Sequence, residues 1–283
     1  MKVLISGSTG LVGKHLSAAL KSKGFEVVSA GRTDFASGAA ALAEKVNKVE
    51  VVVNLAGAPV VARWSEAYKK EIEDSRFQTT AMLTEAISLA TKKPRLFIST
   101  SAVGIYPDGE VFTEANARVG DDFLAKVCTA WEARAMKAAK ETKVAIFRLG
   151  IVLAADGGAL QKMLLPFKMG LGGPIATGKQ GFSWIHINDL VNAYLFVIEK
   201  QLQGVFNLTS PRPTDNATYT RALGKVLHRP VFMPIPAFAL KLVFGEGALM
   251  LTSGQKAIPE NLIKAGFVFE HPDIEEALAD LLK

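Results

Sequence analysis

The sequence predicts an α/β protein with a doubly wound parallel sheet and a smaller C-terminal subdomain. Short apolar runs alternate with amphipathic helical segments through the first half of the chain, which is typical of parallel strands covered by helices on both faces. A glycine-rich turn follows the first of these runs. After about Gly150 the sequence becomes rich in glycine and proline, and its last part is helical. These three observations together predict the fold class.

The apolar runs predict the strands in chain order. They cover residues 2–6, 25–30, 49–57, 95–100, 143–153 and 204–209. Helical periodicity predicts helices in the intervening segments. These helices follow the first strand as far as Gly24 and then cover residues 65–91, 121–141 and 189–200. Right-handed crossovers between consecutive parallel strands then give a doubly wound sheet.

Composition and charge limit the classes of function. The chain has 283 residues, of which 49% are hydrophobic, so it can bury a large core. Its net charge of +6 comes from scattered basic residues without a basic tail, so we expect no nucleic-acid partner. The excess positive charge is compatible with binding of anionic small molecules or with no functional role. The first apolar run is short, and prolines and charges interrupt the apolar segment 231–251; we therefore predict a cytoplasmic protein without a membrane partner.

The cysteine and histidine content argues against a disulfide framework and a metal centre. Cys128 is the one cysteine, so no disulfide can form within the chain. It lies at helical spacing in KVCTAW without a nearby histidine, and we interpret it as a half-buried, unreactive thiol. The four histidines lack metal-ligand spacing, so no metal site is predicted.

The segment ISGSTGLVGKHL carries the most informative motif. Gly7, Gly10 and Gly13 have GxxGxxG spacing between the first strand and the first helix. Gly7 permits the turn, Gly10 lets the backbone approach a pyrophosphate, and Gly13 lets the helix pack on the sheet. The free N–H groups and the dipole of the helix favour phosphates. We predict a Rossmann-type dinucleotide site with contacts from Gly7, Ser8, Thr9, Gly10, Leu11, Val12 and Gly13.

The end of the second strand indicates which dinucleotide is bound. NAD-binding proteins usually place an acidic residue there for the ribose, and NADP-binding proteins often use an arginine for the 2′-phosphate. The sequence VVSAGRTD has no acid at the strand end, and Arg32 follows at once. We therefore predict NADP(H). In the alternative interpretation Arg32 is a solvated loop residue and Asp34 binds the ribose.

The motif also defines the expected domains. Residues 1–150 form the dinucleotide-binding Rossmann domain, and residues 183–208 return to it. Residues 151–182 and 209–283 form the substrate-side subdomain.

Several motifs together resemble a known family. They are GSTGLVG, NLAG (54–57), ISTSAVGIY (98–106), RLGIVL (148–153) and FSWIHINDL (182–190). Their order and spacing are similar to those of extended short-chain dehydrogenase/reductases. More narrowly, the chain resembles the atypical sugar-nucleotide-epimerase-like subgroup, often labelled the SulA-like cell-division-inhibitor epimerase family. The resemblance covers essentially the whole chain, including the segment from Asn207 to the C-terminal LADLL.

The resemblance implies a catalytic set, with one departure. The superfamily uses a Ser or Thr after the fourth strand, and a Tyr four residues before a Lys on the next helix. Ser101 then hydrogen-bonds the substrate oxygen and Lys126 contacts the nicotinamide ribose. Asp122 occupies the Tyr position, and beside a lysine it stays ionised, so we interpret it as a salt bridge that orients Lys126. Tyr106 either protonates the substrate oxygen or only lines the pocket.

Other contacts follow from the same resemblance. Leu55, Ala56 and Gly57 are expected to contact the adenosine side or the pyrophosphate through their main chain. His186 is expected to form structural hydrogen bonds, and Asp189 to cap the next helix. Arg148 meets an anion or pairs with an acidic neighbour.

The sequence thus predicts an NADP(H)-dependent oxidoreductase or epimerase-like enzyme. Its substrate would be a small carbonyl or alcohol compound, nucleotide-linked or free. The alternative is a non-catalytic NADP(H)-binding sensor or partner-binding protein, which the absence of Tyr at position 122 favours. The resemblance also implies a homodimer paired through the helices at 65–91 and 121–141.

Overall fold

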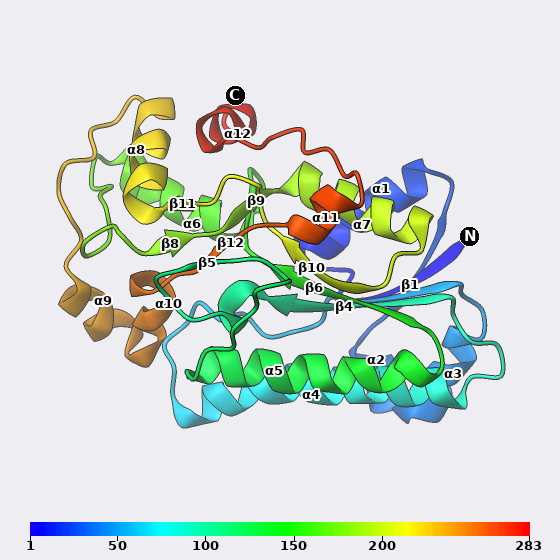
Figure 1. The fold of residues 1–283 in the computed structure, drawn as a ribbon. Helices are drawn as coiled ribbons and strands as arrows, with labels where there is room; N and C mark the ends of the chain where they lie inside the picture. Colours follow the sequence, from blue (N-terminus) through cyan, green and yellow to red (C-terminus); the bar gives the residue numbers. More distant parts are fainter.

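The computed structural model describes residues 1–283 and is organised around one parallel sheet (Figure 1). The sheet has six strands in the order β10-β6-β4-β3-β1-β2. Their bounds are β1 Lys2–Ser6, β2 Glu26–Ala30, β3 Val51–Asn54, β4 Leu96–Ala102, β6 Lys143–Leu149 and β10 Gly204–Leu208. Because β2 lies on one side of β1 and β3 on the other, the topology changes direction between β1 and β3. The doubly wound α/β prediction is confirmed, and ligands of such sheets bind at this switch point.

Helices cover both faces of the sheet. On one face lie α1 (Leu11–Ser22) and α7 (Ile187–Lys200), and on the other lie α3 (Gly38–Val46), α4 (Glu66–Leu89) and α5 (Phe123–Ala135) (Figure 1). The alternation of side chains along each strand explains the two layers. In β1, Val3 and Ile5 pack with α1 and α7, whereas Leu4 packs with α3 and α4.

The structure differs from the predicted elements in two places. The strand predicted over 143–153 is split at Gly150, where β7 (Ile151–Ala154) leaves the sheet and pairs with β9 (Trp184–His186). A Cβ atom at Gly150 would lie 2.6 Å from the carbonyl oxygen of Ser183, so only glycine allows this approach. In addition, α2 (Arg32–Ala36) and α3 form a helical pair that was not predicted, because their alanine-rich sequence has little apolar periodicity.

The C-terminal region packs around a separate core. The remaining elements are η1 Val103–Ile105, β5 Val111–Phe112, η2 Met136–Lys140, α6 Gly158–Lys168, β8 Gly181–Phe182, β11 Thr214–Asp215, α8 Asn216–Val226, α9 Ala237–Phe244, η3 Glu246–Ala248, α10 Leu249–Thr252, β12 Lys256–Ala257, α11 Glu260–Lys264 and α12 Ile274–Leu281. Residues of β7, α6, β8, β9, α8 and α12 form this core, which includes Trp184, Tyr219 and Leu278. None of the helices combines the length and the hydropathy that crossing a membrane requires.

Candidate cofactor and substrate site

The loop after β1 has the backbone shape that its glycines predict. Gly7 has φ +72°, and a Cβ atom there would lie 2.9 Å from the carbonyl carbon of Leu55. A Cβ atom at Gly13 would lie 2.3 Å from the carbonyl oxygen of Gly7. At Gly10, by contrast, a Cβ atom would meet only that same oxygen, at 3.4 Å. The space in front of Gly10 is therefore open, whereas the other two glycines allow close packing.

The N-terminus of α1 has no side-chain partner of its own. Gly10 is the N-cap residue, no side chain caps the helix, and no acidic residue lies in its first turn. The first N–H groups of a helix have no acceptor within that helix, and the helix dipole adds partial positive charge at this end. Together with the open space at Gly10, this end fits a diphosphate.

The segment after β3 lies beside this loop. The amide of Leu55 donates a hydrogen bond to the carbonyl of Ser6 at 3.1 Å, and both Leu55 and Ala56 contact Gly7. Gly57 is next to the guanidinium of Arg76, which donates to the carbonyl of Ala58 at 3.0 Å. The structure therefore brings Leu55, Ala56 and Gly57 together with the glycine loop, at the switch point of the sheet.

The end of β2 distinguishes Arg32 from Asp34. Asp34 accepts a hydrogen bond from the amide of Gly31 at 2.8 Å and pairs with Lys45 at 2.7 Å, and Lys45 lowers its pKa. Arg32 is the first residue of α2, is exposed and forms no ion pair. The Ser8 hydroxyl donates to the hydroxyl of Ser29, the neighbour of the last β2 residue, at 3.0 Å. The Arg32 guanidinium, which forms no ion pair, thus lies just after the end of β2 that contacts the glycine loop. The nearby Asp34 carboxylate, by contrast, is paired with Lys45.

A buried chain of hydrogen bonds fixes helix α5 relative to this loop. The Ser6 hydroxyl donates to Asn54 Oδ1 at 2.6 Å, and Asn54 Nδ2 donates to Thr80 Oγ1 at 2.8 Å. Trp131 Nε1 donates to the same Thr80 oxygen at 2.8 Å. The ends of β1 and β3 are thereby connected through α4 to α5, which carries Lys126.

Asp122 has a different role from the one predicted. It is the N-cap residue of α5, and its carboxylate accepts a hydrogen bond from the amide of Ala125 at 2.8 Å. It forms no salt bridge with Lys126, which is exposed one turn into the helix. The prediction that Asp122 orients Lys126 through an ion pair is therefore wrong. The capping bond satisfies an N–H group that the helix itself cannot.

Ser101 belongs to a buried polar network at the carboxyl ends of β4 and β6. Its hydroxyl donates to Glu132 Oε1 at 2.8 Å, and it is 3% exposed. Arg148 donates to both oxygens of Glu132 at 2.8 Å, a bidentate pair. Burial lowers the pKa of the Arg148 guanidinium, but its bonds to Glu132 raise it by more. Of the two interpretations of Arg148, the structure shows pairing with an acidic neighbour.

Tyr106 lies at the inner end of the same network. Its side chain has no exposed surface, its ring stacks on Phe112, and burial raises the pKa of its hydroxyl. The hydroxyl donates to Asn207 Oδ1 at 2.7 Å and accepts from Arg148 at 2.9 Å. The structure therefore places Tyr106 inside the protein rather than beside Lys126 at the surface. Its hydroxyl already donates one hydrogen bond and accepts another.

Sequence reasoning missed Glu132. A signal was present, because Glu132 lies at helical spacing from Ala125 and Cys128, both on the buried face of α5. An acid on that face needs a cation, and Arg148 at a strand end could have been matched to it. The neighbouring Cys128 is buried, and burial raises the pKa of its thiol to about 11. The low reactivity predicted for this cysteine agrees with that position.

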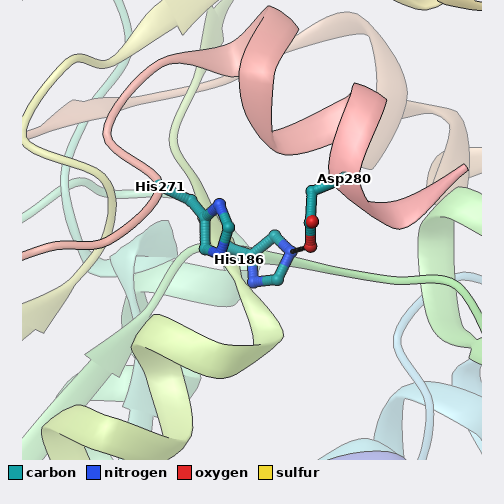
Figure 2. Close-up of side chains that lie close together, drawn as sticks. All are labelled: His186, His271 and Asp280. Carbon is teal, nitrogen blue, oxygen red and sulfur yellow. Dashed lines mark ion pairs between the residues drawn. The ribbon is translucent and has the colours of Figure 1, made fainter. Parts of the chain in front are cut away.

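The histidine predicted to be structural lies in a small cluster at the N-terminus of α7. His186 Nδ1 accepts a hydrogen bond from the amide of Asn188 at 3.1 Å and so caps α7. Its ring stacks on His271 at 3.9 Å, and its Nε2 lies 3.5 Å from Asp280 (Figure 2). Asp189, predicted as the cap, instead accepts the amides of Glu270 and His271.

This cluster is a poor metal centre despite its composition. The ligand atoms of His186, His271 and Asp280 lie within 4.8 Å of one another. However, the two rings are only 27° from parallel, so their in-plane lone pairs do not converge on one point. Because Nδ1 of His186 is a hydrogen-bond acceptor, the neutral ring carries its proton on Nε2, the atom that faces Asp280.

A polar cavity of about 290 Å³ lies outside the central sheet. Residues from three segments line it, at 108–110, 177–181 and 252–256, and none of them is hydrophobic. The middle segment is the glycine-rich loop that precedes β9 in the sequence. Lys179 and Lys256 give this cavity positive charge, and Asp108 and Glu110 give it negative charge.

Comparisons with known proteins agree with this geometry. Residues 3–209 match the NAD dependent epimerase/dehydratase family, and residues 235–281 match a domain of unknown function, DUF1731. The chain is 40% identical over 307 residues to the chloroplastic SDR39U1 homolog of Arabidopsis thaliana, covering 100% of this chain and 87% of that one. It is 35% identical over 295 residues to the epimerase family protein SDR39U1 of Homo sapiens, covering all of both.

A solved structure of the human protein is also similar. The crystal structure of human SDR39U1 isoform 2 with NADPH has a TM-score of 0.92 and 34% identity, and the match covers 99% of each chain. A nucleoside-diphosphate sugar epimerase from Corynebacterium glutamicum has a TM-score of 0.80 and 30% identity over 100% of this chain and 58% of its own. The resemblance deduced from the motifs is confirmed, and the chain belongs to the NAD dependent epimerase/dehydratase family.

Proposed function

We propose that the protein binds NADP(H) and acts as an oxidoreductase or epimerase-like enzyme on a small carbonyl or alcohol substrate. The observation that carries the proposal is the uncapped N-terminus of α1, which faces open space at Gly10 at the switch point of the sheet. The crystal structure of human SDR39U1 with NADPH supports the same cofactor.

Different residues around this crevice contact different parts of the dinucleotide. Residues Gly7–Gly13 hold the diphosphate through main-chain N–H groups, and Leu55–Gly57 lie along the adenosine side. Arg32 meets the 2′-phosphate, because it has no acidic partner, whereas Asp34 is held by Lys45. A guanidinium bound to phosphate through charge-assisted hydrogen bonds distinguishes NADPH from NADH.

Lys126 and Ser101 act on the reaction side. Lys126 is exposed on the first turns of α5 and holds the nicotinamide ribose, as its place in the motif implies. The nicotinamide ring supplies hydride transfer when bound. The Ser101 hydroxyl donates a hydrogen bond to Glu132, so its oxygen remains available as an acceptor for the hydroxyl group of an alcohol substrate. Tyr106 supports Arg148 from inside the protein and serves as a structural residue.

A non-catalytic NADP(H) sensor is the second candidate. The position of the usual catalytic tyrosine holds Asp122, whose carboxylate is a helix cap, and Ser101 is nearly buried. Both features fit a protein that keeps the cofactor site without a proton donor.

A substrate panel separates the two candidates. Purified protein with NADPH or NADP⁺ is incubated with carbonyl compounds, alcohols and nucleotide-linked sugars, and cofactor absorbance and product isomers are measured. The enzyme proposal expects turnover or isomerisation with at least one compound, lost in Lys126→Met and retained in the exposed control Lys137→Met. If NADPH binds tightly and every compound on a broad panel is unchanged, the sensor is supported.

A further inference from the structure

A surface of exposed apolar side chains covers the end of the C-terminal region. Six residues define this apolar surface, and their exposed fractions run from 59% to 78%: Met169, Leu171, Phe232, Met233, Phe238 and Leu242. Single exposed apolar residues are normal in proteins, but a cluster of this size is characteristic of a surface that contacts something apolar.

The six residues belong to segments that lie next to each other. The amide of Ile235 donates to the carbonyl of Pro174 at 2.8 Å, and the amide of Ala176 donates to the carbonyl of Ile235 at 2.9 Å. Gly173 packs against the backbone of Met233. The segment that ends α6 therefore runs beside the segment that enters α9, and the apolar surface extends across both.

Helix α9 has no buried residue of its own. Phe238 and Leu242 are four residues apart, so they project from one side of the helix. In Figure 1 this helix lies at the outer end of the molecule, away from the central sheet. An apolar helix face that its own protein leaves uncovered is available for contact with an external apolar partner.

The charges around the surface identify that environment. Lys168 precedes Met169, Lys241 precedes Leu242, and Arg229 lies three residues before Phe232; all three are exposed and form no ion pair. The acid next to α9, Glu246, pairs with Lys69. In a twofold dimer each surface would meet its own copy, so the unpaired cations of both copies would gather at one interface. A second copy is therefore disfavoured, and an apolar occupant with negative charge at its boundary is favoured.

We propose that this surface docks on an anionic phospholipid bilayer, in contrast to the expectation from the sequence that the protein has no membrane partner. Phe238 and Leu242 enter the boundary between headgroups and acyl chains, and Lys168, Lys241 and Arg229 contact the anionic headgroups. An interfacial helix needs no membrane-spanning length, because it lies in the plane of the surface. Each cation close to an anionic surface contributes about 1 kcal/mol, which is about a fivefold change in binding.

Vesicle flotation tests the proposal on the full-length protein. The probes are vesicles of phosphatidylcholine alone and of phosphatidylcholine with phosphatidylglycerol. We expect binding to the anionic vesicles, at least tenfold weaker binding to the neutral ones, and weakening with added salt. Leu242→Glu with Phe238→Glu should abolish binding, and Lys241→Glu should weaken it about fivefold or more. The matched control is Val268→Glu, at an apolar residue 81% exposed outside the surface.

Two results would overturn the inference. One is a wild-type protein that floats with neither vesicle, or whose flotation the double variant leaves unchanged. The other is a dimer in light scattering that Leu242→Glu converts to a monomer, since that result would assign the surface to a second copy. NADPH binding by each variant verifies that it is folded, and it also separates this test from the proposed function.

Discussion

The cofactor crevice and the reaction side of the site are built in different ways. The crevice is made of backbone: glycines at three spaced positions, the free end of α1 and the segment after β3. The reaction side depends on side chains whose partners are distant in sequence, such as Ser101 with Glu132 and Tyr106 with Asn207. Local sequence rules specify a crevice of backbone groups, whereas the roles of paired side chains are settled only by tertiary structure.

Breaking the buried ion pair should have the largest effect. Glu132→Gln leaves the Arg148 guanidinium buried without its counter-charge, so we expect the free energy of unfolding to fall by about 3–5 kcal/mol. The double variant Glu132→Gln with Arg148→Met should recover part of this loss, because it removes the uncompensated charge. Denaturant unfolding measures both. A change below about 1 kcal/mol in the single variant would show that the pair does not hold the reaction side together.

The pH dependence of stability tests the histidine cluster. Burial, and then the charge of His271, lower the pKa of His186 to about 4, whereas an unfolded histidine titrates near about 6.5. The Asp280 carboxylate raises the His186 pKa and so opposes this shift. Asp189 lies in the first turn of α7, the helix that His186 caps. Below about pH 6.5 His186 becomes protonated in the unfolded chain but stays neutral in the folded protein. The unfolding free energy should therefore be constant above that pH and fall by up to about 3 kcal/mol toward pH 4.

The variant His186→Gln should flatten this profile, whereas His228→Asn, at an exposed histidine outside the cluster, should leave it as in the wild type. An unchanged profile in His186→Gln would assign the acid sensitivity to other groups.

Two alanine variants of the glycine loop should separate packing from cofactor contact. Gly13→Ala places a methyl group 2.3 Å from the Gly7 carbonyl oxygen, so we expect a loss of about 2–3 kcal/mol of stability. Gly10→Ala meets only that oxygen at 3.4 Å, so its stability should change little while NADPH binding weakens. Thermal unfolding and titration of NADPH give the two readouts. Equal stability losses in both variants would contradict this division of roles.

The smallest effect is expected at Asp122. Asp122→Ala removes the N-cap of α5 and should cost about 1 kcal/mol, and Asp122→Asn, which keeps a capping oxygen, should cost much less. An effect of Asp122→Asn on turnover equal to that of Lys126→Met would instead indicate a direct role of this carboxylate in the reaction.

Much of the fold could be predicted from the sequence, because buried parallel strands and amphipathic helices have distinct periods. Gly150 could not be recognised as a strand break, since the break results from its close approach to Ser183, which is distant in sequence and lies between β8 and β9. The burial of Tyr106 depends on Asn207 and Phe112, so its proximity to Ser101 in the sequence was a poor guide to its role. The capping role of Asp122 could have been predicted from the sequence, because an Asp directly before an apolar helical run commonly marks the N-terminus of a helix.

We predict that Arg32 selects NADP(H) over NAD(H) at the free end of α1. Calorimetric titration of NADPH and NADH into the wild-type protein and into Arg32→Ala compares the two affinities. We predict that the wild type binds NADPH at least about tenfold more tightly than NADH, as one charge-assisted contact to phosphate contributes about 1.5–3 kcal/mol, and that Arg32→Ala binds the two with similar affinity. Tighter binding of NADH by the wild type, or no heat with either nucleotide, would contradict the account.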